Sequence, residues 1–227
     1  KINVTLRSKA GILQLSCEQI IDATGRKASV CRKLAIEKEE EDQLMALDFQ
    51  CLIKKEIPAY VHVESFDNGW IYLAPSGRNK LSVMLFSDPD QIPEKKVHEK
   101  FIIDVIGKTL LMKPLLQELT EKTILNLKVR TANSAALKKP YGNNWLAIGD
   151  AAYSYDPVSS YGITSALAGG YYGGHALEDK LTGKPGAMEA YHYIMENAFQ
   201  NYRIKLHNYY NLEKRLSTSA FWKKRHY

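Results

Sequence analysis

Cysteine is scarce in this sequence, and the pattern of the few that are present argues against two kinds of site. The 227 residues include three cysteines, Cys17, Cys31 and Cys51, an odd number with no CxxC pair. Neither a disulfide framework nor a zinc site is indicated. We therefore expect free, buried thiols in a reducing cytoplasm, and we predict no metal site.

Long apolar segments are also missing. No apolar run approaches the roughly 18 residues of a membrane span, so we expect no transmembrane segment. No basic segment followed by an apolar one marks a signal peptide. The chain opens without Met, in what reads as the middle of a strand. We expect it to be part of a longer protein.

Charge of one sign is only mildly in excess. Lys and Arg number 31 against 25 Asp and Glu, a net charge of +6, and apolar residues make up 45%. This composition predicts a globular chain that suits an anionic ligand. The one dense basic run, residues 223–226, is interpreted as a solvated tail, and we predict no nucleic-acid binding.

Alternating apolar and polar residues predict strands through the first half of the chain. The first two form a hairpin around residues 9–11. Four more strands, expected to form an antiparallel sheet or meander, are separated by turn residues and lie at 45–54, 59–66, 69–75 and 80–87. The charge-dense segment 33–43 is interpreted as a solvated loop or helix end.

Helical patterns dominate the second half. Helices are predicted at about 94–107 and 111–119, a strand at 124–130 and a buried strand at 143–150. A helix rich in Gly and Ala follows Tyr161. The last helix, about 187–215, carries Tyr191, Tyr202 and Tyr209 at near-helical spacing, which indicates core or interface positions. The fold class is α/β, as an α+β mixture.

Two segments share one physical form, an apolar strand followed by a small or acidic turn. They are residues 20–26 and 146–152. Ligands of open α/β sheets bind beyond the carboxyl ends of strands. Asp150 offers two acceptor oxygens suited to sugar or polyol hydroxyls. The helix that begins near Gly162 offers free N–H groups to a pyrophosphate or a reduced ring. An Asp after a strand also often caps a helix or forms a turn, and spacing alone leaves both interpretations open.

The motifs IIDATGR and WLAIGDAAYSYDPVSSYGITSAL carry a resemblance. They resemble the ATG and GD-to-DPxxxxG motifs of FAD-dependent monooxygenases of the para-hydroxybenzoate hydroxylase superfamily, most closely the tryptophan-halogenase-like and geranylgeranyl-reductase-like branches. The resemblance implies a partial Rossmann-type FAD-binding domain interleaved with an antiparallel β-sheet substrate domain and C-terminal helices. The FAD-binding part would comprise 1–43 and 124–185, the substrate domain 44–123, and the helical region 186–227.

The resemblance also implies roles for individual residues. Asp150 would hold the ribitol hydroxyls of FAD, and Gly25 and Arg26 would lie near its adenosine-diphosphate half. The backbone of Gly162 and Ile163 would face the flavin ring. The implied cofactor site comprises Gly25, Arg26, Gly149, Asp150, Pro157, Tyr161, Gly162 and Ile163. The implied substrate contacts are Trp70, Tyr72 and Pro75, for which plain sheet core is the competing interpretation.

The sequence departs from the family in two places. No GxGxxG occurs in it, since GGYYGG at 169–174 has the wrong spacing. We therefore expect a C-terminal portion of a longer flavoprotein. The WxWxIP motif of halogenases is replaced by residues 70–75, WIYLAP, which disfavours a true halogenase.

The resulting functional prediction is an FAD-dependent oxidoreductase. It would be a monooxygenase or hydroxylase that uses reduced flavin and O2 on a small organic or partner-borne substrate. NAD(P)H or a supply of reduced flavin would donate the electrons. The alternatives are an isoprenoid reductase, a halogenase-like enzyme and a non-enzymatic binding module. The six histidines are scattered, and no catalytic residue is predicted.

Overall fold

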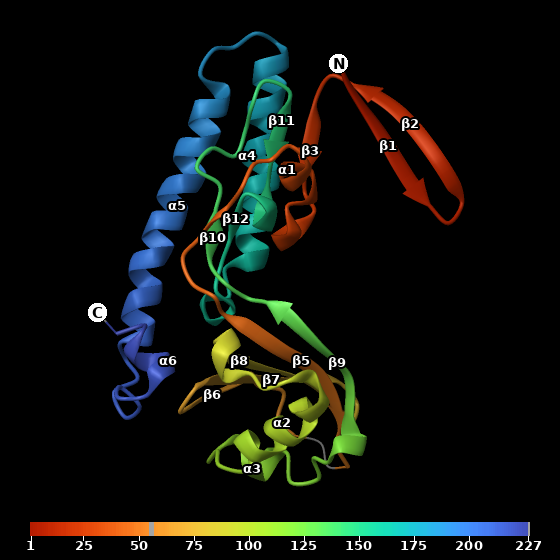
Figure 1. Cartoon of the computed structure of the whole chain (residues 1–227). Helices are drawn as coiled ribbons and strands as arrows, with labels where there is room; N and C mark the ends of the chain where they lie inside the picture. Colours follow the sequence, from red (N-terminus) through yellow and green to blue (C-terminus); the bar gives the residue numbers. More distant parts are fainter. Residues whose placement is uncertain (55–56, 227) are drawn as a thin grey trace. The chain divides into compact units, whose positions relative to one another are not determined.

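The computed structural model describes residues 1–54 and 57–226, and the chain forms two compact units. Unit 1 contains residues 1–42 and 133–204, and unit 2 contains residues 43–132 and the chain from 205 onward (Figure 1). The chain returns to unit 1 at 133, whereas the expected FAD-binding segment began at 124. The difference arises because β9 (Ile124–Thr131) pairs with β5 (Met45–Leu52) inside unit 2.

Unit 2 is built on a five-stranded antiparallel sheet. Its strands β6 (His62–Phe66), β7 (Gly69–Gly77) and β8 (Lys80–Ser87) form a meander, and β5 and β9 complete the order β6-β7-β8-β5-β9. The predicted strands and the antiparallel meander are confirmed. Gly69 is required where β7 starts, because a Cβ there would lie 1.8 Å from the carbonyl oxygen of Phe86.

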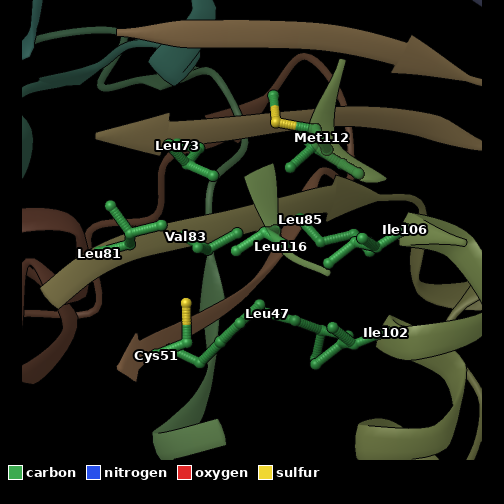
Figure 2. Packing of buried hydrophobic residues seen from close by; sticks show 12 residues of the cluster. Leu47, Cys51, Leu73, Leu81, Val83, Leu85, Ile102, Ile106, Met112 and Leu116 are labelled. Carbon is green, nitrogen blue, oxygen red and sulfur yellow. The ribbon is translucent and has the colours of Figure 1, made fainter. Parts of the chain in front are cut away.

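The core of unit 2 lies between this sheet and two helices. Alternate residues of β5, β7 and β8 point toward α2 (His98–Ile106) and α3 (Met112–Leu115). Figure 2 shows the packing, in which the labelled side chains are Leu47, Cys51, Leu73, Leu81, Val83, Leu85, Ile102, Ile106, Met112 and Leu116. The helix predicted at 111–119 is shorter than expected, because Leu119 N–H bonds the Leu116 carbonyl and tightens the end into a turn.

The C-terminal residues of unit 2 pack against its sheet through aromatic side chains. Trp70 stacks on Phe86 at 3.9 Å between ring centroids, and its indole N–H donates to the Tyr210 hydroxyl at 3.2 Å. Just after the short helix α6 (Ala220–Lys223), Lys224 and Arg225 pair with the carboxylate of Asp88. The interpretation of this basic run as a solvated tail is therefore wrong, since two of its cations serve as structural anchors.

Unit 1 begins with the predicted hairpin, β1 (Ile2–Ser8) and β2 (Gly11–Cys17). Its other elements are short strands, one short helix and two long helices. A parallel pair joins β3 (Ile20–Asp22) to β11 (Trp145–Ala147), and a small antiparallel sheet has the order β12 (Tyr153–Ser154), β10 (Ala135–Ala136), β4 (Glu39–Glu40). The helices are α1 (Ser29–Lys33), α4 (Gly162–Leu181) and the first part of α5 (Ala187–Tyr210).

Two of the three α5 tyrosines predicted at core or interface positions are buried. Tyr191 and Tyr202 are almost fully buried, as core positions should be, but Tyr209 is 57% exposed and Tyr210 is buried instead. The helix leaves unit 1 at Ile204. After Ile204 the helix packs within unit 2, where Tyr210 contacts Trp70 and α6. Different residues are therefore buried there than the spacing from Tyr191 predicts.

Small residues of α4 allow the helix to lie close to the end of β11. Gly169 and Gly173 are buried on the face toward it. A Cβ on Gly173 would lie 2.8 Å from Ile148 Cγ2, and a Cβ on Gly169 would lie 3.0 Å from the backbone nitrogen of Gly149. The stripe of small residues read from the sequence is thus a packing feature that positions residues 148 and 149.

Adjacent glycines of α4 give a matched test of this packing. We expect Gly173→Ala to lower the free energy of unfolding by about 1–3 kcal/mol, because the stiff Ile148 side chain must move. Gly174→Ala should instead raise it by up to about 1 kcal/mol through helix propensity, since no described atom lies within 4 Å of its Cβ position. Urea denaturation of both variants measures the difference. Equal effects of the two changes would contradict close packing.

Buried thiols predict a loss of stability at alkaline pH. Cys31 and Cys51 are buried, as predicted, while Cys17 is half-buried. Burial raises the pKa of the Cys51 thiol from 9.0 to about 11, so the unfolded chain releases this proton at lower pH than the folded chain does. Stability should therefore fall as pH rises from about 9 toward 11.

The variant Cys51→Val tests this effect. Between about pH 8 and about pH 10, the wild-type free energy of unfolding should drop by about 1 kcal/mol more than that of Cys51→Val. Urea denaturation at the two pH values measures it, with Cys17→Val as the control substitution. An identical drop in wild type and Cys51→Val would show that this thiol does not contribute.

Candidate functional site

The two segments singled out in the sequence lie side by side in unit 1. In the parallel pair, Asp22 is the partner of Ala147, and the N–H of Ile148 donates to the Asp22 carbonyl at 3.0 Å (Figure 1). Their carboxyl ends therefore meet, and the turns that begin with Gly25 and Gly149 follow at one edge. This pairing is consistent with the implied site, in which Gly25 and Arg26 of the first segment lie near Gly149 and Asp150 of the second.

Asp22, at the end of β3, has a structural role. One carboxylate oxygen accepts hydrogen bonds from the backbone and side chain of Thr24, and the other accepts from the N–H groups of Val30 and Cys31 at the start of α1. Burial alone would raise the pKa of Asp22, but these hydrogen bonds outweigh it and hold the pKa below its usual value. Both carboxylate oxygens of Asp22 therefore accept hydrogen bonds from residues nearby in the sequence, as those of a helix-capping residue do.

Asp150, at the end of β11, is different. Its side chain is 31% exposed, and its ion pair is with Arg26, Nε to Oδ2 at 3.6 Å. It lies in the short helical turn Gly149–Ala151, which starts with Gly149 at a φ of +55°. The two aspartates that follow strands thus differ. Asp22 accepts from the first N–H groups of a helix, as a cap does. Asp150 has a partly exposed carboxylate.

Arg26 joins three segments of unit 1. Besides its pairing with Asp150, its guanidinium donates to the carbonyl of Asn133 at 2.5 Å and to the carbonyl of Tyr155. The adjacent Gly25 has a φ of +69°, and no described atom lies within 4 Å of its Cβ position. The guanidinium is therefore engaged with protein carbonyls, while the Gly25 backbone remains approachable.

The loop before α4 is a rigid turn. Asp156 is fully buried, and its carboxylate accepts the N–H of Val158 at 2.9 Å, which fixes the turn Pro157–Ser159. Tyr161 and Ile163 follow at 37% and 79% exposure, with Gly162 between them opening the helix. The side chain of Tyr161, the residue before α4, makes no capping hydrogen bond to the helix, and the Tyr161 N–H itself donates to the Ser159 hydroxyl at 3.3 Å. The first N–H groups of α4 have no partner within the helix, as at any helix start.

Tyrosine hydroxyls of α5 bind the backbone at the end of β11 and in the loop before α4. Tyr191 donates to the carbonyl of Ala147 at 2.8 Å, and the N–H of Asp156 donates to the Tyr202 hydroxyl at 2.7 Å. The sequence marked these tyrosines as core or interface but did not assign their hydroxyls. The signal available was the combination of near-helical spacing with a polar group that must find a partner when buried.

Lys38 is the site residue that sequence reasoning missed. Its ammonium donates to the Asp150 carbonyl at 2.7 Å and to the Ser154 hydroxyl at 3.1 Å. Burial lowers its pKa to about 8, although the nearby Asp150 charge opposes the change. No local pattern identifies it, because it lies within the charged segment 33–43 that reads as solvated.

The candidate substrate residues lie on β7 of unit 2. Trp70 is 2% exposed and packs in the sheet core, whereas Tyr72 and Pro75 are half-buried. A substrate could reach the Trp70 ring only if its neighbours moved. Contact between a substrate and Tyr72 or Pro75 stays a prediction.

Two further kinds of feature are absent from the described residues. None of their helices is long and apolar enough to cross a membrane. No group of three or more His, Cys, Asp or Glu side chains in residues 1–54 and 57–226 is arranged to hold a metal ion.

The sequence is similar to one protein family and to one curated relative. The model of the tryptophan halogenase family matches residues 4–226. LodB of Marinomonas mediterranea, which is named as an FAD-dependent oxidoreductase, is 28% identical over 214 residues, covering 92% of this chain and 56% of LodB.

Solved structures show the same fold. The flavin-dependent halogenase CmlS has a TM-score of 0.86 at 19% identity over 99% of this chain and 42% of its own. The myxobacterial chondrochloren halogenase CndH has a TM-score of 0.85 at 22% identity, over 100% and 55%. The peptidyl tryptophan dihydroxylase QhpG, essential for tryptophylquinone cofactor biogenesis, has a TM-score of 0.82 at 18% identity, over 98% and 52%. The chain spans about half the length of these proteins.

Arg26 offers a test of the observed geometry. We expect Arg26→Met to lower the free energy of unfolding by about 2 kcal/mol, because two carbonyl acceptors lose a charged donor. Arg32→Met is the matched control, because Arg32 lies nearby on α1 and its side chain is exposed. Urea denaturation of both variants measures the difference. If Arg26→Met is no less stable than Arg32→Met, the guanidinium does not hold these segments together.

Proposed function

Because the chain belongs to the tryptophan halogenase family, we propose that it forms part of an FAD-dependent oxidoreductase. One observation on the chain itself supports this most. The Asp150 carboxylate remains accessible at the end of β11, whereas the matching Asp22 at the end of β3 is consumed by local hydrogen bonds. A carboxylate that served only as a turn former would be satisfied locally in the same way.

The residues present fit FAD. The two Asp150 oxygens can accept hydrogen bonds from ribitol hydroxyls. Apart from the neighbouring residues and, for Gly162, the backbone of its own helix, no described atom lies within 4 Å of the Cβ positions of Gly25 and Gly162, so the backbone at both turns can approach a ligand closely. The start of α4, with Gly162 and Ile163, favours an anionic or electron-rich group. Gly149, Pro157 and Tyr161 shape the turn and loop between Asp150 and that helix.

The roles of these residues are to bind, orient and shield. Bound FAD, once reduced, would supply the electrons that activate O2. Asp150 would fix the ribitol chain, and the buried Asp156 would keep the Pro157–Ser159 turn in place. Arg26 would act mainly by holding the Asp150 turn against the carbonyls of Asn133 and Tyr155, a role different from direct contact with the adenosine-diphosphate half of FAD.

We propose hydroxylation as the reaction, on a small organic or a partner-borne substrate. Replacement of the halogenase WxWxIP motif by residues 70–75 supports hydroxylation over halogenation. The fold shared with QhpG, a peptidyl tryptophan dihydroxylase, supports a protein-borne aromatic substrate. The fold shared equally with CmlS and CndH keeps halogenation as the second candidate. NAD(P)H or a separate supply of reduced flavin would provide the electrons, and the free thiols support a cytoplasmic location.

Product analysis separates the two reactions. The product of the natural gene, supplied with reduced flavin, O2 and chloride or bromide, is incubated with free and peptide-borne aromatic substrates. Mass spectrometry should show a gain of oxygen. A halogen in place of hydrogen would instead establish the second candidate.

Asp150 gives the direct test of cofactor binding. The product of the natural gene, purified without added cofactor, should carry the absorbance of bound flavin. Asp150→Ala should weaken FAD binding by about tenfold or more, since each lost hydrogen bond to a charged group costs about 1.5–3 kcal/mol. Flavin fluorescence titration measures the dissociation constant.

The matched control is Asp104→Ala, which removes an exposed carboxylate of α2 and should leave FAD affinity unchanged. Wild-type protein that is colourless and does not take up added FAD would contradict the proposed function and favour a non-enzymatic binding module.

A further inference from the structure

The ammonium of Lys38 is turned into unit 1, although its sequence neighbours are exposed. Glu37 and Glu39 on either side are exposed, whereas Lys38 is half-buried and makes two hydrogen bonds inside the unit. A long cationic side chain normally extends into water. The inward direction of the Lys38 side chain is therefore explained by the acceptors that its ammonium binds.

The small three-stranded sheet places Lys38 beside the Asp150 turn. Lys38 directly precedes β4, which pairs with β10, and β10 pairs in turn with β12, where Ser154 lies. The ordering of these three strands brings Lys38 within 3.1 Å of the Ser154 hydroxyl and within 2.7 Å of the Asp150 carbonyl. The ammonium thus bridges the two ends of the segment that follows β11.

Two cations hold Asp150 from different sides. Arg26 faces its carboxylate, and Lys38 binds its backbone carbonyl. We propose that Lys38 is a positioning residue, whose charged ammonium holds the Asp150 turn in the conformation that binds FAD. This inference rests on the proposed function. Lys38 acts through Asp150, and its contribution is set by hydrogen bonds to a carbonyl and a hydroxyl that strengthen when the donor is charged.

The groups around Lys38 explain why its charge can matter within an ordinary pH range. The charged or titratable groups that face it are Asp150 and Arg26 of the two turns, Cys31 of α1 and Glu40 of β4. The pKa of Cys31 is raised to about 12 by burial and by Asp22, so this thiol stays neutral while Lys38 loses its proton.

Three variants, made in the product of the natural gene, test the proposal. Lys38→Met removes the donor and should raise the dissociation constant of FAD about tenfold. Lys38→Arg keeps the positive charge and should restore the affinity to within about threefold of wild type. Lys33→Met, an exposed lysine of α1, is the matched control and should leave the affinity unchanged.

A pH profile provides a readout that a purely structural residue would not change. As pH rises through about 8, wild-type Lys38 loses its charge, and the FAD dissociation constant should rise at least about threefold by about pH 9.5. In Lys38→Arg the constant should stay flat across this interval, because the guanidinium keeps its proton. The wild-type profile needs no variant, so the test holds even if Lys38→Met does not fold.

The outcomes are distinct. A wild-type dissociation constant that does not change between about pH 7 and about pH 9.5, a Lys38→Met affinity equal to wild type, or equal losses in Lys38→Met and Lys33→Met would each overturn the inference. If FAD binding depends on Asp150 but not on Lys38, only this inference fails. If the wild-type protein does not bind FAD at all, the proposed function fails first.

Discussion

The parallel pairing of β3 with β11 is the constraint on which the candidate site depends. These two short strands come from the two separate chain segments of unit 1, and the hydrogen bond from the Ile148 N–H to the Asp22 carbonyl joins their ends. Because parallel strands end at the same edge, Arg26 and Asp150 are delivered to one place. A shift of one residue in this register would move Asp150 away from Arg26 and from Lys38 together.

The pairing of β3 with β11 is supported by two neighbouring helices, α4 through small residues and α5 through a tyrosine hydroxyl. On one side, Gly169 and Gly173 let α4 approach Gly149 and Ile148 so closely that no Cβ fits. On the other, Tyr191 supplies a hydroxyl to the carbonyl of Ala147, so the last backbone acceptor of β11 is not left unsatisfied. Burying two tyrosines without partners for their hydroxyls would be costly. The same residues therefore fill the core and satisfy the backbone.

Much of this architecture follows from local sequence patterns. Alternation predicts the hairpin and the strands of unit 2, and the pattern around Asp150 predicts a carboxylate that follows a strand and precedes a helix. The helix at 111–119 is shorter than predicted, because the Leu119 N–H turns back onto the Leu116 carbonyl. The strand at 124–130, expected in the FAD-binding part, pairs with β5 in the sheet of unit 2, and only this distant partner determines its place.

The residues that prediction missed share one property, which is that their partners are distant in sequence. Lys38 lies in a run of glutamates that any local reading assigns to solvent, yet it meets Asp150 and Ser154 across the small sheet. Lys224 and Arg225 look like a free basic tail and instead pair with Asp88. In each case the local sequence specifies a charge, and the fold specifies its counter-group.

The electrostatic setting of Asp150 follows from this arrangement. The Asp150 carboxylate faces the Arg26 guanidinium at 3.6 Å, its own carbonyl accepts from the Lys38 ammonium, and its side chain remains 31% exposed. Since the guanidinium and the ammonium are held by other acceptors, their positions do not depend on a ligand. A site whose charges are already oriented loses little free energy to reorganisation when a ligand binds. In the proposed FAD site, this preorganisation by two cations would limit the free-energy cost of binding.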